Sequence, residues 1–157
     1  MADAREIVLT PFGQRLSLAD VRRIAYPVAQ HIGARIVEMI GPGVTPNFHG
    51  VMLDEPLRWG ETQRVYLLHS DDYDAWAVVA PADPRCEPED GWFHLHYPRF
   101  LDHEGIAAAM ADFHGIALWS SYELSMAVPP DFPQRAPNDL AHWQPPRLGD
   151  ALFNWWD

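Results

Sequence analysis

The sequence has no lysine, a single cysteine and no long apolar run, and each absence narrows what the chain can do. Its eleven cationic residues are all arginines, and twenty-two acidic residues bring the formal charge to −11 with neutral histidines. Binding to a phosphate backbone or an anionic lipid surface needs clustered cations, so this charge argues against a nucleic-acid or membrane partner. The lone Cys86 cannot form a disulfide within the chain, which is typical of a reducing compartment.

A membrane segment and an export signal are also missing from the pattern. No window approaches the roughly 18 consecutive apolar residues of a transmembrane helix. Residues 1–16 carry charges where a signal peptide needs an apolar stretch. We therefore expect a cytoplasmic protein. Its 157 residues, 48% of them apolar, are enough for one domain over residues 1–157 with a core of its own.

The first predicted helix follows Ser17, which can cap the free N–H groups of the next turn. Gly33 is a favourable residue just after the end of a helix. The apolar stripe between them comprises Leu18, Val21, Ile24, Ala25, Val28 and Ile32. Pro27 lacks an N–H group, so we expect it to kink the helix or split it near Tyr26.

A run of predicted strands follows, with a second helix after most of them. The strand-like segments are residues 35–40, 48–53, 64–70, 74–80, 92–97 and 116–126. Residues 70–73 form a predicted hairpin turn. The second helix is expected to begin near Asp102 and to end at Gly115. This order predicts an α+β fold, in which two main helices pack on one face of a mostly antiparallel sheet of five or six strands.

The C-terminal segment, residues 129–157, has a different character. It holds six prolines between Pro129 and Pro146, too many for regular structure. Its end carries four large apolar side chains, Leu152, Phe153, Trp155 and Trp156. Such groups are costly to leave in water, so we expect the tail to dock on the domain. The alternative is an aromatic surface that binds a partner chain.

The densest acidic cluster lies at the predicted turn, where Asp71, Asp72 and Asp74 flank Tyr73 and Trp76. A calcium loop of the EF-hand type would need a closing glutamate at its twelfth position, where this sequence has alanine. Two interpretations remain. The cluster is either a polar hairpin tip or an exposed acidic and aromatic patch that meets a basic protein partner.

The strongest metal-binding pattern is His94-x-His96. Residues two apart on a strand point to the same side, roughly 6–7 Å apart, so both imidazoles could bind one zinc, iron or manganese ion. Candidate third ligands are His69, Asp102, His103 and Glu104. The alternative is a pair of polar side chains on the solvent face of a sheet.

Patterns of nucleophilic or phosphate chemistry are absent from the sequence. There is no Gly-x-Ser-x-Gly elbow and no glycine-rich phosphate loop. Cys86 lies between Arg85 and Glu87 in a proline-flanked loop, with no base that would activate its thiol. The sequence therefore favours a binding function over a catalytic one.

In general character the chain resembles bacterial toxin-immunity proteins. It is small, acidic, α+β and rich in aromatic residues, and it lacks a catalytic signature. The resemblance is one of class, and no residue is carried over from it. It implies a non-enzymatic cytoplasmic protein that binds and neutralises a cognate toxin, with carboxylates that attract a basic toxin domain.

Two other functions stay open from the sequence. One is a small metal-dependent or His-dependent enzyme that uses His94 and His96, where a divalent metal would be the cofactor. The other is a structural or oligomerising subunit, which also needs an exposed adhesive surface. The favoured hypothesis, a protein-binding module, needs no cofactor and no catalytic residue.

Overall fold

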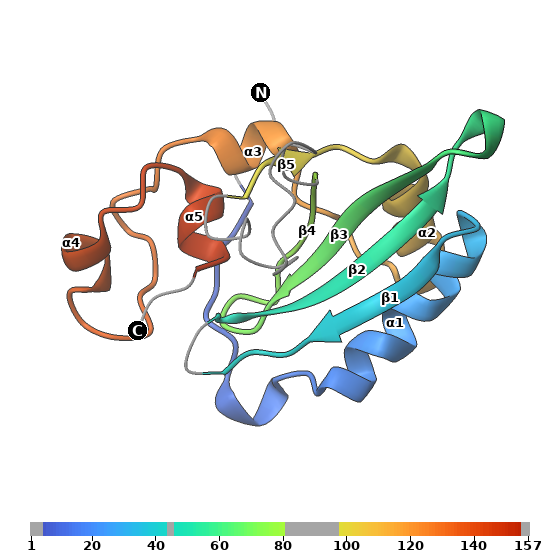
Figure 1. The fold of residues 1–157 in the computed structure, drawn as a ribbon. Coiled ribbons are helices and arrows are strands. Elements are labelled where there is room, and N and C mark those ends of the chain that lie inside the picture. Colours follow the sequence, from blue (N-terminus) through green and yellow to red (C-terminus); the bar gives the residue numbers. More distant parts are fainter. Residues whose placement is uncertain (1–4, 44–45, 81–97, 155–157) are drawn as a thin grey trace.

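A five-stranded antiparallel sheet forms the centre of the structure (Figure 1). The computed structural model describes residues 5–43, 46–80 and 98–154. The strands lie in the order of the sequence: β1 (Arg35–Ile40), β2 (Phe48–Pro56), β3 (Thr62–Ser70), β4 (Trp76–Val79) and β5 (Phe100–Leu101). With two long helices and three short ones beside the sheet, this arrangement confirms the predicted α+β fold.

Both long helices pack on the same face of the sheet, as predicted. Helix α1 (Leu18–His31) and helix α2 (Glu104–His114) contribute apolar stripes to one core cluster. Its buried members are Val21, Ala25, Val28, Ala29, Val51, Leu53, Val65, Leu67, Trp76, Val78, Ile106, Ala109 and Met110. The strand residues in this cluster alternate along each strand, as the pleat requires.

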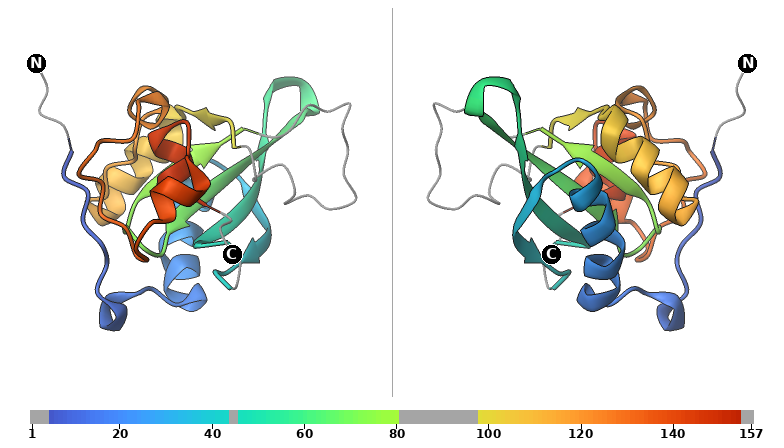
Figure 2. Two further views of the ribbon diagram at one scale, coloured as in Figure 1. Left: turned by 90° about the vertical axis from the view of Figure 1, so that its left-hand side faces the viewer. Right: turned by 90° about the vertical axis from the view of Figure 1, so that its right-hand side faces the viewer.

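The opposite face of the sheet is covered by the C-terminal part of the chain. In the right-hand view of Figure 2, α1 and α2 lie in front of the sheet and the red C-terminal segment lies behind it. Helices α3 (Ser121–Ser125), α4 (Asp139–Trp143) and α5 (Leu148–Leu152) belong to this layer. Leu152 and Phe153 are fully buried there. Trp155 and Trp156, the other half of the predicted apolar end, lie outside the described residues.

Helix α1 begins as the sequence predicted. The Ser17 hydroxyl accepts the Asp20 N–H, and the Asp20 carboxylate accepts the Ser17 N–H, which together form a capping box. Gly33 has a φ of 70°, the left-handed conformation that ends a helix. Of the two effects expected of Pro27, a kink or a split, the split is absent, because α1 is continuous from Leu18 to His31. Buried residues on either side of the proline hold the two halves against the sheet, which outweighs one lost hydrogen bond.

Helix α2 begins one residue later than expected, because His103 and not Asp102 is its N-cap. The Nδ1 atom of His103 accepts the N–H of Ile106 at 3.0 Å. The Asp102 carboxylate instead accepts the N–H and the hydroxyl of Ser121. The helix ends at Gly115, with a φ of 63°, as predicted.

The strand predicted over residues 116–126 is wrong. Residues 121–125 form the short helix α3, which starts with a capping box between Ser120 and Glu123. The pattern Ser-x-x-Glu was visible in the sequence and is a helix signal, whereas the apolar alternation pointed to a strand. The predicted strand over residues 92–97 lies outside the described residues.

Candidate functional site

The acidic turn between β3 and β4 is mostly buried, so the expected exposed patch is not formed there. Asp71, Tyr73 and Trp76 are buried, and Asp72 is nearly so. Only the Asp74 side chain, which is 67% exposed, reaches solvent freely. The expectation of an exposed cluster is therefore wrong for most of its members, while a binding role for this turn stays a prediction.

Two arginines from distant parts of the chain explain why these carboxylates are inside. Arg15 forms ion pairs with Asp71 and Asp72, each at 2.9 Å. Arg135 donates from Nε to the same Asp72 oxygen at 3.2 Å, and Asn47 donates to the other oxygen at 3.1 Å. Burial raises the pKa of Asp71, and the charge of Arg15 opposes that rise. The cluster is thus neutralised within the chain.

The aromatic members of the turn belong to the two cores. The Tyr73 hydroxyl donates to the Pro133 carbonyl at 2.8 Å, and its ring lies 5.0 Å from that of Phe132. Burial raises the pKa of the Tyr73 phenol. Trp76 packs against His69 on the opposite face, with ring centroids 4.5 Å apart. Neither ring is available to a partner.

A pair of buried histidines lies beside this turn. The Nδ1 atoms of His49 and His69 are 3.2 Å apart, and His69 Nε2 donates to Asp74 at 2.7 Å. Because the carboxylate accepts a hydrogen bond from His69 Nε2, His69 Nδ1 accepts a hydrogen bond from the N–H at His49 Nδ1. Burial, helped by the neighbouring His69, lowers the pKa of His49 to about 4. Both rings are 2% exposed, so no large substrate reaches them.

The predicted metal ligands His94 and His96 lie outside the described residues, so their site stays a prediction. Three of the four candidate third ligands have other partners, and the fourth, Glu104, is exposed. His69 is engaged as above, Asp102 holds α3, and His103 contacts Glu55 at 2.7 Å. Within residues 5–43, 46–80 and 98–154, no group of three potential ligands converges.

The turn between β2 and β3 has the opposite character and was missed by sequence reasoning. It projects from the body of the structure (Figure 1) and contains the short helix η2 (Arg58–Gly60). Trp59 is 96% exposed and has a φ of 68°, a conformation that bulky residues rarely adopt. Leu57, also exposed, closes the turn through its N–H to the Glu61 carbonyl at 2.7 Å. The sequence signal that could have indicated this turn is the pair Trp59-Gly60 between two predicted strands.

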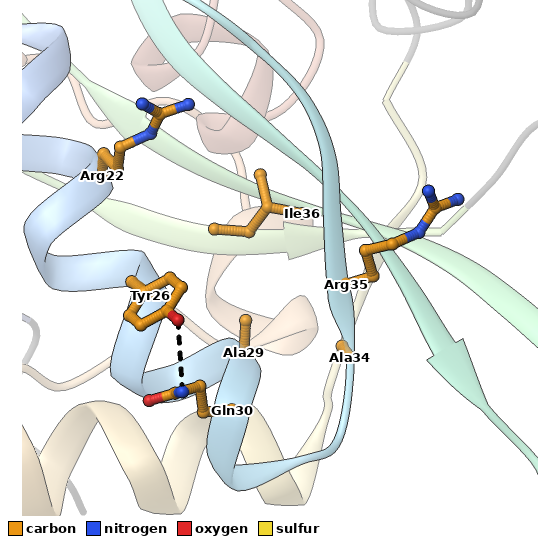
Figure 3. A pocket seen from close by; sticks show the side chains of 7 residues that line it. All are labelled: Arg22, Tyr26, Ala29, Gln30, Ala34, Arg35 and Ile36. Atoms are coloured by element: carbon orange, nitrogen blue, oxygen red, sulfur yellow. Dashed lines mark hydrogen bonds between the residues drawn. The ribbon is translucent and has the colours of Figure 1, made fainter.

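A groove of about 510 Å³ lies between α1 and β1 (Figure 3). Its helix side presents Arg22, Tyr26 and Gln30, and the Gln30 amide donates to the Tyr26 hydroxyl at 3.3 Å. Its remaining lining residues are Ala29, Ala34, Arg35 and Ile36. Aromatic, apolar and cationic groups therefore share one open groove.

None of the helices in the described ranges has the length and apolar character that a membrane-spanning segment needs. No family model, curated protein or solved structure matches the chain.

Proposed function

We propose that this protein is a non-enzymatic protein-binding module and that the projecting β2–β3 turn is its contact element. The observation that carries the proposal is Trp59, which is almost fully exposed at the tip of the hairpin. Tryptophan is the residue type most enriched among binding hot spots, because its large ring gains much on burial. Such a ring in water contributes nothing to the fold.

The backbone at Trp59 supports the same proposal. A left-handed φ costs a bulky residue roughly 1–2 kcal/mol, which glycine or asparagine would avoid. Gly60 next to it also has a positive φ, 77°. The free-energy cost of this backbone conformation is offset if the exposed indole binds a partner.

The net negative charge of the chain supports a more specific proposal. The partner is a basic toxin domain, and this chain inhibits the toxin by binding it. Opposite charges speed association and set the orientation of the partners. Glu61, beside the tip, is exposed and could face such a partner. Screening by salt should then slow the association.

The test is co-purification of a stoichiometric protein partner from the native host, with Trp59→Asn as the variant. Asparagine tolerates the left-handed conformation, so the turn is retained while the ring is removed. Tyr122→Ser is the control, because Tyr122 is a highly exposed aromatic residue on α3, far along the chain from this turn. The proposal predicts that only Trp59→Asn loses the partner. A partner that both variants retain would contradict it.

A further inference from the structure

We infer that the groove between α1 and β1 receives Trp59 of a second copy of this chain, so that two copies associate reciprocally. The inference rests on the proposed role of Trp59 as a contact residue and names one partner for it. Since one indole cannot occupy two sites, self-association and capture of another protein through Trp59 would exclude each other.

The placement of the two surfaces carries the first step. Arg35, on the rim of the groove, pairs with Asp54 at the start of β1, and β2 then runs on to Pro56 before the turn. A Cβ added at Gly33 would lie 3.6 Å from the Pro56 side chain. The β2–β3 turn therefore extends past the end of the sheet at which β1 begins (Figure 1), and Arg35 and Ile36 line the groove at this same end. A two-fold axis at this end brings each tip to the other copy's groove, a self-complementary interface.

The chemistry of the groove fits an indole. Tyr26 is 56% exposed and offers a ring face on which a second aromatic ring can stack. Arg22 is exposed, and among the described residues its guanidinium forms no hydrogen bond or ion pair. A guanidinium over an indole face is a favourable cation–π pair. The volume of about 510 Å³ is in the range of sites that enclose a group of this size.

The position of the strand supports the same occupant. Among the described strands β1 pairs with β2 alone, and its other edge runs beside the groove. Val37 in this strand is partly exposed. A hairpin from a second copy that enters the groove would also cover part of this edge. Exposed strand edges are otherwise prone to pair with other chains.

The net charge sets how strong the association can be and how it responds to salt. Two copies at −11 each repel one another, so the contact must be apolar and cation–π in origin. Added salt screens the repulsion and should tighten the dimer. This dependence is opposite in sign to that expected for a basic toxin partner.

The test is sedimentation velocity of the whole chain from about 1 μM to about 1 mM, the range of weak association. Wild type should show a concentration-dependent dimer that Trp59→Asn and Arg22→Glu each weaken at least about tenfold. Arg23→Glu is the matched control, because Arg23 is a neighbouring exposed arginine that does not line the groove, and it should behave as wild type.

Mixing the two defective variants gives the sharpest result. The Arg22→Glu chain retains its tryptophan and the Trp59→Asn chain retains its groove, so the mixture should form a heterodimer through one of the two contacts. Wild type that stays monomeric throughout, or a dimer that both variants retain, would overturn the inference. If wild type is monomeric while Trp59-dependent capture of another protein persists, the proposed function stands without it.

Discussion

The two hairpin turns of this sheet differ in what they do with their chemistry. The β3–β4 turn is rich in carboxylates, yet most of it is buried and paired with arginines from within the chain. The β2–β3 turn has one arginine and one glutamate over residues 57–61. It also holds an almost fully exposed tryptophan in a left-handed backbone conformation. Most side chains of the β3–β4 turn are buried and stabilise the fold, whereas Trp59 of the β2–β3 turn is exposed to solvent.

The difference teaches that a charged cluster in a sequence does not indicate an exposed surface. Asp71 and Asp72 are inside because Arg15 and Arg135 return to them from more than fifty residues away along the chain. Buried charges need partners, and those partners were not visible from the local pattern. Exposure at Trp59 has the opposite cause, since its hairpin extends beyond the other elements that the structure describes (Figure 1).

The largest effect is expected at the C-terminal segment that covers the buried turn. Phe153 is fully buried and packs against Phe48 and Phe100. Phe153→Ala should lower the free energy of unfolding by about 3–5 kcal/mol, measured by urea denaturation. Phe113→Ala, at a half-exposed ring on α2, is the control and should cost much less. If Phe153→Ala loses as little free energy of unfolding as Phe113→Ala does, the C-terminal segment does not contribute to the core.

Asp72 should come next, because its carboxylate joins three side chains. Asp72→Ala leaves Arg15, Arg135 and Asn47 without a shared acceptor and should cost about 2–3 kcal/mol of unfolding free energy. Asp112→Ala, at an exposed carboxylate on α2, is the matched control and should change stability by less than about 0.5 kcal/mol. If both variants unfold alike, the ionic cluster does not stabilise the turn.

Burial of His49 predicts a pH dependence of stability on the opposite face of the sheet, where α1 and α2 pack. The pKa of His49 is about 4 in the folded chain, below its ordinary value of 6.5. Between these values the unfolded chain binds more protons at this site, so stability falls as the pH falls. From pH 7 to pH 5 the wild type should lose about 2 kcal/mol more than His49→Gln does.

The titration of the His49 ring, followed by NMR, checks the same prediction without a variant. A midpoint near 4 is the expected result. A midpoint near 6.5 would mean that the ring is not held neutral by burial, and the pH dependence should then be assigned to other groups.

The smallest effect on stability is expected at the exposed turn. Trp59→Asn removes no buried surface and relieves an unfavourable backbone conformation, so the free energy of unfolding should change by less than about 1 kcal/mol, toward greater stability. Thermal and urea unfolding measure it directly. A loss as large as that of Asp72→Ala would show that Trp59 supports the fold, which the structure does not suggest.

Local signals predicted much of the fold. Ser17 with Asp20, and glycines 33 and 115, mark helix ends because capping depends on residues next to one another in sequence. Alternation along β3 and β4 is also visible in the sequence, and the alternating residues Val65, Leu67, Trp76 and Val78 lie in one core cluster. The strand expected over residues 116–126 failed because the capping box at Ser120 outweighed the alternation.

The candidate site was harder to predict, because it depends on contacts between distant segments. The burial of Asp71 and Asp72 needs Arg15 and Arg135, and the groove needs α1 to lie beside β1. The exposure of Trp59 depends on how far the hairpin extends, which the pattern of its own residues does not set. Sequence reasoning therefore selected the more charged turn and overlooked the more exposed one.

The central claim is that recognition lies at the β2–β3 turn and not at the acidic one. Side-by-side binding of Trp59→Asn and Asp74→Asn tests it most directly, because each variant changes the most exposed side chain of its turn and suits the left-handed backbone there. The measurement is the amount of partner captured, or of dimer formed, at matched protein concentration. If recognition lies at the β2–β3 turn, Trp59→Asn loses binding at least about tenfold while Asp74→Asn retains it. Binding that survives in Trp59→Asn and fails in Asp74→Asn would instead place recognition at the acidic turn.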